Sequence, residues 1–287
     1  MAQRIFTGID IGTQQVKVVI AAAPQSPESP MQILATASAA SKGMRHGFIV
    51  DSKEVTRAIR AAVDRASQAA RVQVRSARIA MGGISLEEAR SAAEITLTAS
   101  GGIVSGRDIE RVIDESEKRA VSKLTNRAVL HTIPLEFRLD GTALQGRPTG
   151  MQGNRLGVDT MLITMLAQHH DDLITAVEAA GIEVEGVMAS PLAASLVTLS
   201  KAQKTAGVVL ANIGAETTSI VVFDNDVPIS LKVFPVGSNE ITNAIALSFQ
   251  LSLAEAEQLK RGAVIGSAIS PKKLSTVMSA RLKELYT

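Results

Sequence analysis

The sequence has no cysteine, no tryptophan and a single tyrosine among its 287 residues. Without cysteine, disulfides and thiolate metal sites are excluded, and a reducing compartment is consistent with this composition. Aromatic residues make up only 2% of the chain, which argues against base stacking with single-stranded nucleic acid. Lys and Arg together number 30 against 28 for Asp and Glu, and they form no long basic run. We therefore expect no nucleic-acid partner.

Long apolar runs are missing as well. The segment that ends at Asp10 has no apolar core of the kind found in signal peptides. The apolar stretch from Val16 to Ala23 is interrupted by Lys17 and is too short to cross a bilayer. These absences predict a soluble cytoplasmic protein. The apolar fraction of 46% is still ample for a buried core, and the length fits one large domain or two to three smaller ones.

Two similar stretches organise the chain. Residues 207–223, GVVLANIGAETTSIVVF, contain an apolar run, a turn with Gly214, and a run rich in β-branched residues. Residues 6–20, FTGIDIGTQQVKVVI, follow the same order around Gly12. A glycine turn between strands lets a backbone approach an anion closely and offers it N–H groups. Two such turns, about 200 residues apart, predict two related half-domains whose phosphate-binding hairpins share one cleft.

The segments around each hairpin extend this repeat. In the first half, strands at Ile5–Ile9, Val16–Ala23 and Gln32–Ala39 precede a helix that Asp51 or Ser52 can cap. In the second half, a third strand at Ile229–Val236 precedes a helix over 239–249. Both halves therefore show the order β-β-β-α. Between them, residues 76–156 change pattern and end in a glycine-rich loop, which predicts an inserted small domain.

Duplicated β-β-β-α units are typical of the actin, sugar-kinase and Hsp70 superfamily. Within it, the chain resembles the bacterial cell-division family FtsA. The matching segments follow the family's order: TGIDIGTQQVKVVI, KGMRHGFIVD, NRAVLHTIPLEFRLDG, GMQGNRLGVDTMLIT, ASPLAASLVTLS, the second hairpin, FPVGSNEITNAIA and AEAEQLKRG. The phosphate motifs identify only the superfamily, whereas the inserted domain is shared mainly with FtsA and the pilus assembly protein PilM.

The resemblance implies an α/β fold of the actin-like kind. Its ribonuclease H-like units would be duplicated, with an inserted α+β subdomain, 1C, of SHS2 type. Subdomain 1A would comprise residues 1–75 and 157–190, subdomain 1C residues 76–156, and partial subdomains 2A and 2B residues 191–287. Family members continue beyond the position where this chain stops, so we expect a chain truncated at its C-terminus.

The same resemblance implies which residues would hold ATP and Mg²⁺. Asp10 would lie near the metal and its waters, and no catalytic residue is assigned. Glu257 and Lys260, three residues apart on one helix face, would contact the ribose and adenine. The remaining positions would surround the phosphates: Gly12, Thr13, Gln14 and Lys17 from the first half, and Gly214, Thr217, Thr218 and Gly237 from the second.

The second phosphate motif departs from the family pattern. Where the family motif normally begins with Asp, this chain has Asn212. An amide cannot orient metal-bound water as a carboxylate does. Glu216 replaces a glycine, and a negative charge beside phosphates is unfavourable unless the side chain points away. Other departures are Ala215, Ser219, Ser238 and Asn243. We therefore expect weakened nucleotide binding and weak or no ATP hydrolysis.

The resemblance implies an actin-like division protein that self-associates into filaments and links the FtsZ ring to the membrane, recruiting other divisome proteins. Such a protein acts in the cytoplasm, at the inner face of the membrane at the division site. Membrane contact would require a C-terminal helix supplied from elsewhere. Two alternatives stay open: a PilM-like cytoplasmic component of type IV pilus assembly, and an ATPase or kinase of the superfamily. Asn212 counts against the kinase.

Overall fold

The first half of the chain is built on a five-stranded sheet. The structure, a computed structural model, describes residues 4–24, 26, 29–98, 101–263 and 269–286. The strand order is β11-β6-β1-β2-β3, in which β1, β2 and β3 are antiparallel and β6 and β11 run parallel to β1. The strands are β1 (Ile5–Ile11), β2 (Gln15–Ala22), β3 (Gln32–Ala40), β6 (Ser76–Met81) and β11 (Glu183–Ala189).

Two helices cover one face of this sheet, α1 (Ser52–Ala70) and α3 (Ala167–Ala179). The carboxylate of Asp51 accepts the backbone N–H of Glu54 and so caps α1, as the sequence predicted. The apolar residues of α1 recur at helical spacing and are buried against the sheet. They belong to a core that also includes strand residues such as Ile9, Ile20 and Ile79.

The inserted unit is a four-stranded sheet with one helix. Its order is β7-β10-β8-β9, with β7 (Glu87–Thr96), β10 (Arg155–Leu166), β8 (Arg127–Leu139) and β9 (Thr142–Leu144). Helix α2 (Gly106–Val121) packs on it and begins at Ser105, which forms a capping box with Asp108. Pro134 lies at a register shift of β8, where a residue without an N–H does not interrupt a ladder bond.

Two strands near the expected domain boundaries belong to a different sheet than expected. Strand β6 was expected in the inserted unit, yet it lies between β1 and β11 in the first sheet. Most of β10 was expected in the first unit, yet it lies between β7 and β8. Strands at a junction are placed by their pairing partners, and these partners, β1 for β6 and β7 for β10, are distant in sequence.

A third sheet belongs to the second half. After α4 (Ser190–Thr198) and α5 (Lys201–Ala206) come β12 (Val208–Ile213), β13 (Thr218–Asp224) and β14 (Val227–Phe234). The free edge of β14 is bonded by side chains of β7. The Glu88 carboxylate accepts the N–H of Leu231 at 2.7 Å, and the Arg90 guanidinium donates to the carbonyl of Ile229. The inner face of this sheet joins the first core through Val221, Phe223 and Leu231.

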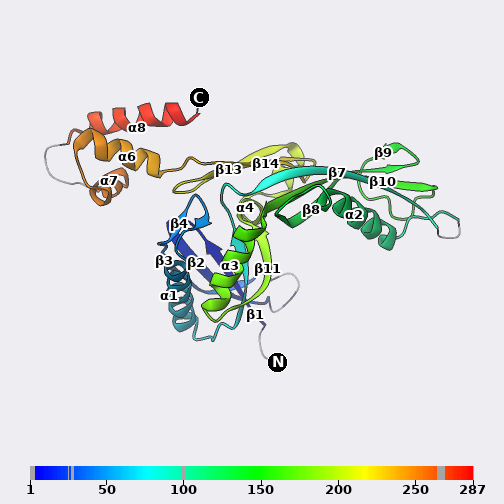
Figure 1. Ribbon diagram of the computed structural model, residues 1–287, viewed down its shortest axis with the longest axis horizontal. Helices are drawn as coiled ribbons and strands as arrows, with labels where there is room; N and C mark the ends of the chain where they lie inside the picture. The colour runs from blue at the N-terminus through cyan, green and yellow to red at the C-terminus, as the bar shows by residue number, and fades with distance from the viewer. Residues whose placement is uncertain (1–3, 25, 27–28, 99–100, 264–268, 287) are drawn as a thin grey trace.

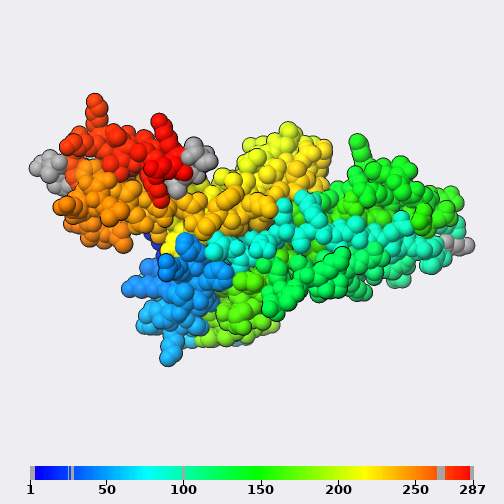
Figure 2. All heavy atoms as spheres, turned by 45° about the horizontal axis from the view of Figure 1, so that its top comes forward, coloured from blue at the N-terminus to red at the C-terminus, as the bar shows by residue number. Residues whose placement is uncertain are grey.

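The chain described ends in a lobe of three helices, α6 (Asn239–Phe249), α7 (Leu253–Lys260) and α8 (Pro271–Tyr286). Their apolar residues form a small core of their own. The order β-β-β-α thus recurs in the second half, but α6 packs on α7 and α8, whereas α1 packs on its preceding strands. Figure 1 shows the lobe projecting from the end of the molecule opposite to the inserted sheet. Figure 2 shows the same elongated arrangement in a space-filling view.

None of the helices in the described part of the chain has both the length and the apolar character that crossing a bilayer needs.

Candidate functional site

The two glycine turns have the same backbone design. In the first hairpin Ile11 pairs with Val16, and in the second Ile213 pairs with Thr218, so each turn has four residues. The N–H of Gly12 donates to the carbonyl of Gln15 at 3.1 Å. The N–H of Gly214 donates to the carbonyl of Thr217 at 2.8 Å. The two hairpins that resemble each other in sequence therefore also have the same turn length and the same backbone hydrogen bond.

Glycine is required at the first position of both turns by space. A Cβ added to Gly12 would lie 2.9 Å from the carbonyl oxygen of Gln15. A Cβ added to Gly214 would lie 3.0 Å from that of Thr217. In both turns an added side chain would therefore crowd the carbonyl of the fourth residue of the same turn.

The two turns line one cavity of about 250 Å³. Segments from both halves of the chain contribute to it, together with the loop that follows β6. The lining residues are Asp10, Ile11, Gly12, Thr13, Gln14, Gln15, Lys17, Gly47, Gly82, Gly83, Ser190, Asn212, Ile213, Gly214, Ala215, Thr217 and Ser238. The structure thus brings together seven of the residues expected to hold a nucleotide.

Charge is distributed unequally between the two turns. Asp10 pairs with Lys17 across the first hairpin, and their side chains form an ion pair of 3.3 Å. The equivalent pair in the second hairpin is Asn212 and Ser219, which are both neutral. Among the described residues that line the cavity, the acidic one, Asp10, and the basic one, Lys17, both come from the first half. No group of three or more His, Asp or Glu in the described residues could hold a metal ion.

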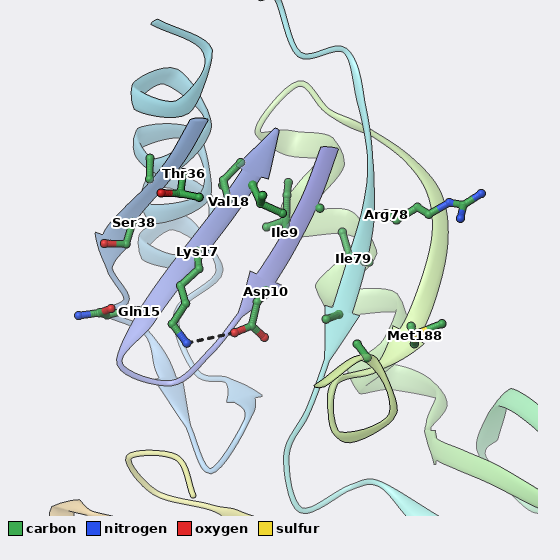
Figure 3. Close-up of a pocket in the computed structure, with 15 residues that line it drawn as sticks. Ile9, Asp10, Gln15, Lys17, Val18, Thr36, Ser38, Arg78, Ile79 and Met188 are labelled. Carbon is green, nitrogen blue, oxygen red and sulfur yellow. Dashed lines mark hydrogen bonds and ion pairs between the residues drawn. The ribbon is translucent and has the colours of Figure 1, made fainter. Parts of the chain in front are cut away.

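A larger hollow of about 740 Å³ adjoins this cavity and shares Asp10, Gln15 and Lys17 with it. Figure 3 shows it on the face of the first sheet opposite to α1, with Asp10 and Lys17 pointing toward one another at its lower rim. Its lining includes the small residues Gly8 and Ala80 beside larger apolar residues such as Val19. The ion pair therefore lines both hollows, and the side chains of Lys17 and Asp10 are 63% and 40% exposed.

The other expected residues of the second half lie behind the cavity wall. The hydroxyl of Thr218 donates to the carbonyl of Val236 at 2.8 Å. A Cβ added to Gly237 would lie 2.5 Å from the backbone of Ala215 and 2.6 Å from the nitrogen of Glu216. Gly237 and Thr218 thus connect the second turn to the segment that follows β14.

Glu257 and Lys260 face α6 and bond to one another at 2.6 Å. Thr242 donates to the Glu257 carboxylate at 2.7 Å and accepts from Lys260 at 2.8 Å, while Lys260 also reaches the carbonyl of Ser238 at 3.1 Å. Burial disfavours the ionised form of Glu257, but hydrogen bonds from Lys260, Thr242 and Arg261 outweigh burial and lower its pKa to about 2. This network joins α7 to the first turn of α6, next to the cavity residue Ser238.

The cavity also contains residues that the sequence did not assign to the site. Gly47 comes from a small hairpin of β4 (Met44–Arg45) and β5 (Phe48–Ile49), and Gly82 and Gly83 follow β6. Ser190 begins α4, and its hydroxyl would lie 2.6 Å from a Cβ on Gly82. The sequence feature that could have identified the three glycines is their position directly after a strand or within a short loop, where glycine allows close approach of two backbones.

Solved structures of low sequence identity share this fold. A chain of the PilM–PilN type IV pilus biogenesis complex aligns with a TM-score of 0.68 at 19% identity, covering 98% of this chain and 74% of that one. Spiroplasma citri MreB5 bound to ADP aligns with a TM-score of 0.53 at 10% identity, covering 99% and 76%. These likenesses show the expected actin-like fold and carry no further conclusion.

Family comparisons are more specific. The model of the SHS2 domain inserted in FtsA matches residues 83–164, and the model of cell division protein FtsA matches residues 209–283. FtsA of Bacillus subtilis is 30% identical over 90% of the chain, which spans 57% of that relative's length. FtsA of Borreliella burgdorferi is 27% identical over 100% of the chain, which spans 74% of that relative. The chain therefore belongs to the FtsA family of cell-division proteins and carries that family's inserted SHS2 domain.

Proposed function

We propose that this chain is an ATP-binding scaffold of the cell-division apparatus, in which the nucleotide's phosphates bridge the two halves. The observation that carries this proposal is the pair of equivalent turns at Gly12 and Gly214, which face one cavity. Glycine turns suit an anion, because a backbone without side chains can approach it closely and offer N–H groups. Nucleotide binding would then fix the angle between the halves, as a ligand favours the conformation that it binds better.

The phosphates would lie between Gly12, Thr13, Gln14 and Lys17 on one side and Gly214 and Thr217 on the other. Ligand pockets commonly measure roughly 300–1,000 Å³, so a cavity of about 250 Å³ suits a phosphate chain better than a whole nucleotide. Thr218 and Gly237 would support the second turn. Glu257 and Lys260 would approach the ribose and adenine from α7.

Magnesium would be held through Asp10. Mg²⁺ usually keeps several waters and takes one or two carboxylates plus phosphate oxygens. A single lining carboxylate fits that pattern. When bound, the ion would neutralise phosphate charge. The neutral Asn212–Ser219 pair in the other half supplies no second carboxylate, so we propose binding with little or no hydrolysis.

The cellular role follows from the family. We propose that the chain self-associates into filaments at the division site, contacts FtsZ and other divisome proteins, and reaches the inner face of the membrane where a C-terminal helix is supplied. Membership of the FtsA family supports this reading over pilus assembly, because the likeness to PilM is one of fold. Co-sedimentation with FtsZ polymers tests it, with an unrelated actin-like protein as the control. Equal recovery of the chain in the pellet with and without FtsZ would contradict FtsZ binding.

Calorimetric titration of ATP with Mg²⁺ tests the nucleotide site. Lys17→Met removes a basic side chain that lines the cavity. It should raise the Kd for ATP by about tenfold, since charge-assisted bonds to phosphate are the strong ones. Lys53→Met, on the exposed side of α1, is the matched control and should leave the Kd unchanged. Equal binding by both variants would contradict a phosphate site at this cavity. Sustained phosphate release by the wild type would contradict the scaffold reading in favour of an ATPase.

A further inference from the structure

We propose that Glu216 is a positioning residue, which fastens the second glycine turn to the small hairpin of the first half and thereby sets the width of the cavity between them. The Glu216 carboxylate accepts the backbone N–H of His46 at 2.6 Å. In return, Nδ1 of His46 lies 3.2 Å from the backbone carbonyl of Glu216. The two residues are 170 positions apart in the sequence, so the pair joins the two halves directly.

The small hairpin presents an N–H that its own turn cannot satisfy. Arg45 pairs with Phe48, which leaves His46 and Gly47 as a two-residue turn. Their φ angles of 49° and 89° are those of a type I′ turn. In such a turn the only internal hydrogen bond joins the residues that flank the two central ones. The N–H of His46 therefore points outward, and Glu216 supplies its acceptor.

The tip of this hairpin has little freedom on its other side. A Cβ added to Gly47 would lie 2.3 Å from the Cα of Gly83. The carbonyl of His46 also accepts the N–H of Ile84 at 3.2 Å. Since Gly47, Gly82 and Gly83 line the cavity, the position of the hairpin tip determines the shape of one cavity wall.

The turn that carries Glu216 is held just as firmly. The N–H of Asn239 donates to the carbonyl of Ala215 at 2.8 Å, and that of Ser238 donates to the carbonyl of Gly214 at 2.9 Å. Gly237 packs against Ala215 and Glu216 so closely that no Cβ would fit. Glu216 thus links the second glycine turn to the turn of the β4–β5 hairpin. Because both turns are held in place, this bond fixes their relative position.

This contact also explains how an acid is tolerated beside a phosphate site. Glu216 occupies the third place of its turn, equivalent to Gln14 in the first turn, and does not line the cavity. Its carboxylate is bonded to the N–H of His46. Its φ lies outside the left-handed region, so the position does not demand glycine. Where the family has a flexible glycine, this chain has Glu216, whose side chain bonds the second turn to the first half.

Hydrogen–deuterium exchange of the nucleotide-free protein tests the bond itself. Bonds to charged groups are strong enough to change a local opening equilibrium by about ten- to a hundredfold. Glu216→Ala should therefore speed exchange in residues 44–49 by at least about tenfold. Glu216→Gln, which keeps an oxygen acceptor, should have a smaller effect. Glu178→Ala, an exposed position on α3, is the matched control and should match the wild type.

Unchanged exchange in residues 44–49 of Glu216→Ala would overturn the proposal. If that variant also exchanges faster throughout β10, it has lost its fold, and the comparison then rests on Glu216→Gln, whose exchange in 44–49 must still exceed that of the wild type.

A second measurement asks whether the bond positions the nucleotide, a step that rests on the proposed function. Stopped-flow release of a fluorescent ATP analogue should be about tenfold faster from Glu216→Ala than from the wild type. Faster exchange with unchanged release would overturn the positioning role. If the wild type binds no analogue, the proposed function fails while the exchange experiment still decides whether the bond between the halves exists.

Discussion

Gly237 shows how much of the second turn depends on one missing side chain. Its Cα lies behind Ala215 and Glu216, and a Cβ there would come within 2.5 Å of backbone atoms that cannot rotate away. A substitution must therefore move the turn that carries Gly214. The same reasoning separates this glycine from Gly106 at the start of α2, where an added Cβ meets nothing within 4 Å.

We predict that Gly237→Ala lowers the free energy of unfolding by about 1–3 kcal/mol, the usual cost of forcing an atom into a packed site. It should also weaken ATP binding, because the displaced turn lines the cavity. Gly106→Ala should be neutral or slightly stabilising. Urea unfolding and ATP titration of both variants check this. A Gly237→Ala protein with wild-type stability and affinity would show that the turn is free to shift.

Glu257 is the residue whose charge the structure stabilises most clearly. Its pKa falls from 4.5 to about 2, so the folded protein binds fewer protons there than the unfolded chain does between these values. The resulting stabilisation is complete above pH 4.5 and is lost as the pH falls toward 2.

We predict that Glu257→Gln costs about 1–3 kcal/mol at pH 7 and that the difference from the wild type shrinks below pH 4.5. Urea unfolding followed by circular dichroism at pH 7, 5 and 3.5 measures it. Glu178→Gln, exposed on α3, is the control. A stability difference that stays constant down to pH 3.5 would mean that the Glu257 network does not depend on ionisation.

At the scale of elements, β7 binds the edge of β14 through side chains rather than through a backbone ladder. Glu88 accepts the N–H of the buried residue Leu231, and Lys232 beside it lies 3.7 Å from the same carboxyl group. This contact ties the inserted sheet to the second half. An edge strand covered in this way is also protected from pairing with another chain.

We predict that Glu88→Ala destabilises the protein by about 1–3 kcal/mol, because it leaves the buried N–H of Leu231 without its acceptor. Glu94→Ala, on the same strand, removes only an exposed ion pair with Arg155 and should cost less than about 1 kcal/mol. Denaturant midpoints of the two variants decide the matter. Equal losses would mean that the edge of β14 finds another acceptor, such as water.

The elements themselves were largely predictable from the sequence. The helix over 239–249 and the cap at Asp51 depend on neighbouring residues, and the structure confirms both. The placement of β6 and β10 was not predictable, since each pairs with strands from another part of the chain. The same holds for His46, whose site-forming partner is 170 residues away. Periodicity identifies a strand, but it does not identify the strand's neighbour.

At the scale of the whole molecule, the described residues form three hydrophobic cores of unequal size. The first sheet, its helices and the inner face of the third sheet share the largest core, whereas α6, α7 and α8 bury a few residues among themselves. Such a small core gives little free energy to oppose local opening. The lobe is therefore the part of the described structure that we expect to open first.

We predict that amides in α6 to α8 exchange at least about tenfold faster than those in β10 at pH 7. Glu257→Gln should accelerate exchange in the lobe and leave β10 unchanged, because its network joins α7 only to α6. Exchange mass spectrometry of the intact chain measures both. Uniform protection across the lobe and β10 would show one cooperative unit.

The two glycine turns finally give the site a direction. Two turns with the same backbone and the same side chains would accept an elongated anion in either of two opposite orientations. Here Asp10 and Lys17 stand at one turn, and Asn212 and Ser219 stand at the other. If the cavity binds a phosphate chain with its magnesium, as proposed above, the carboxylate that would hold the metal lies at one turn alone, so the phosphate chain would bind in a single orientation.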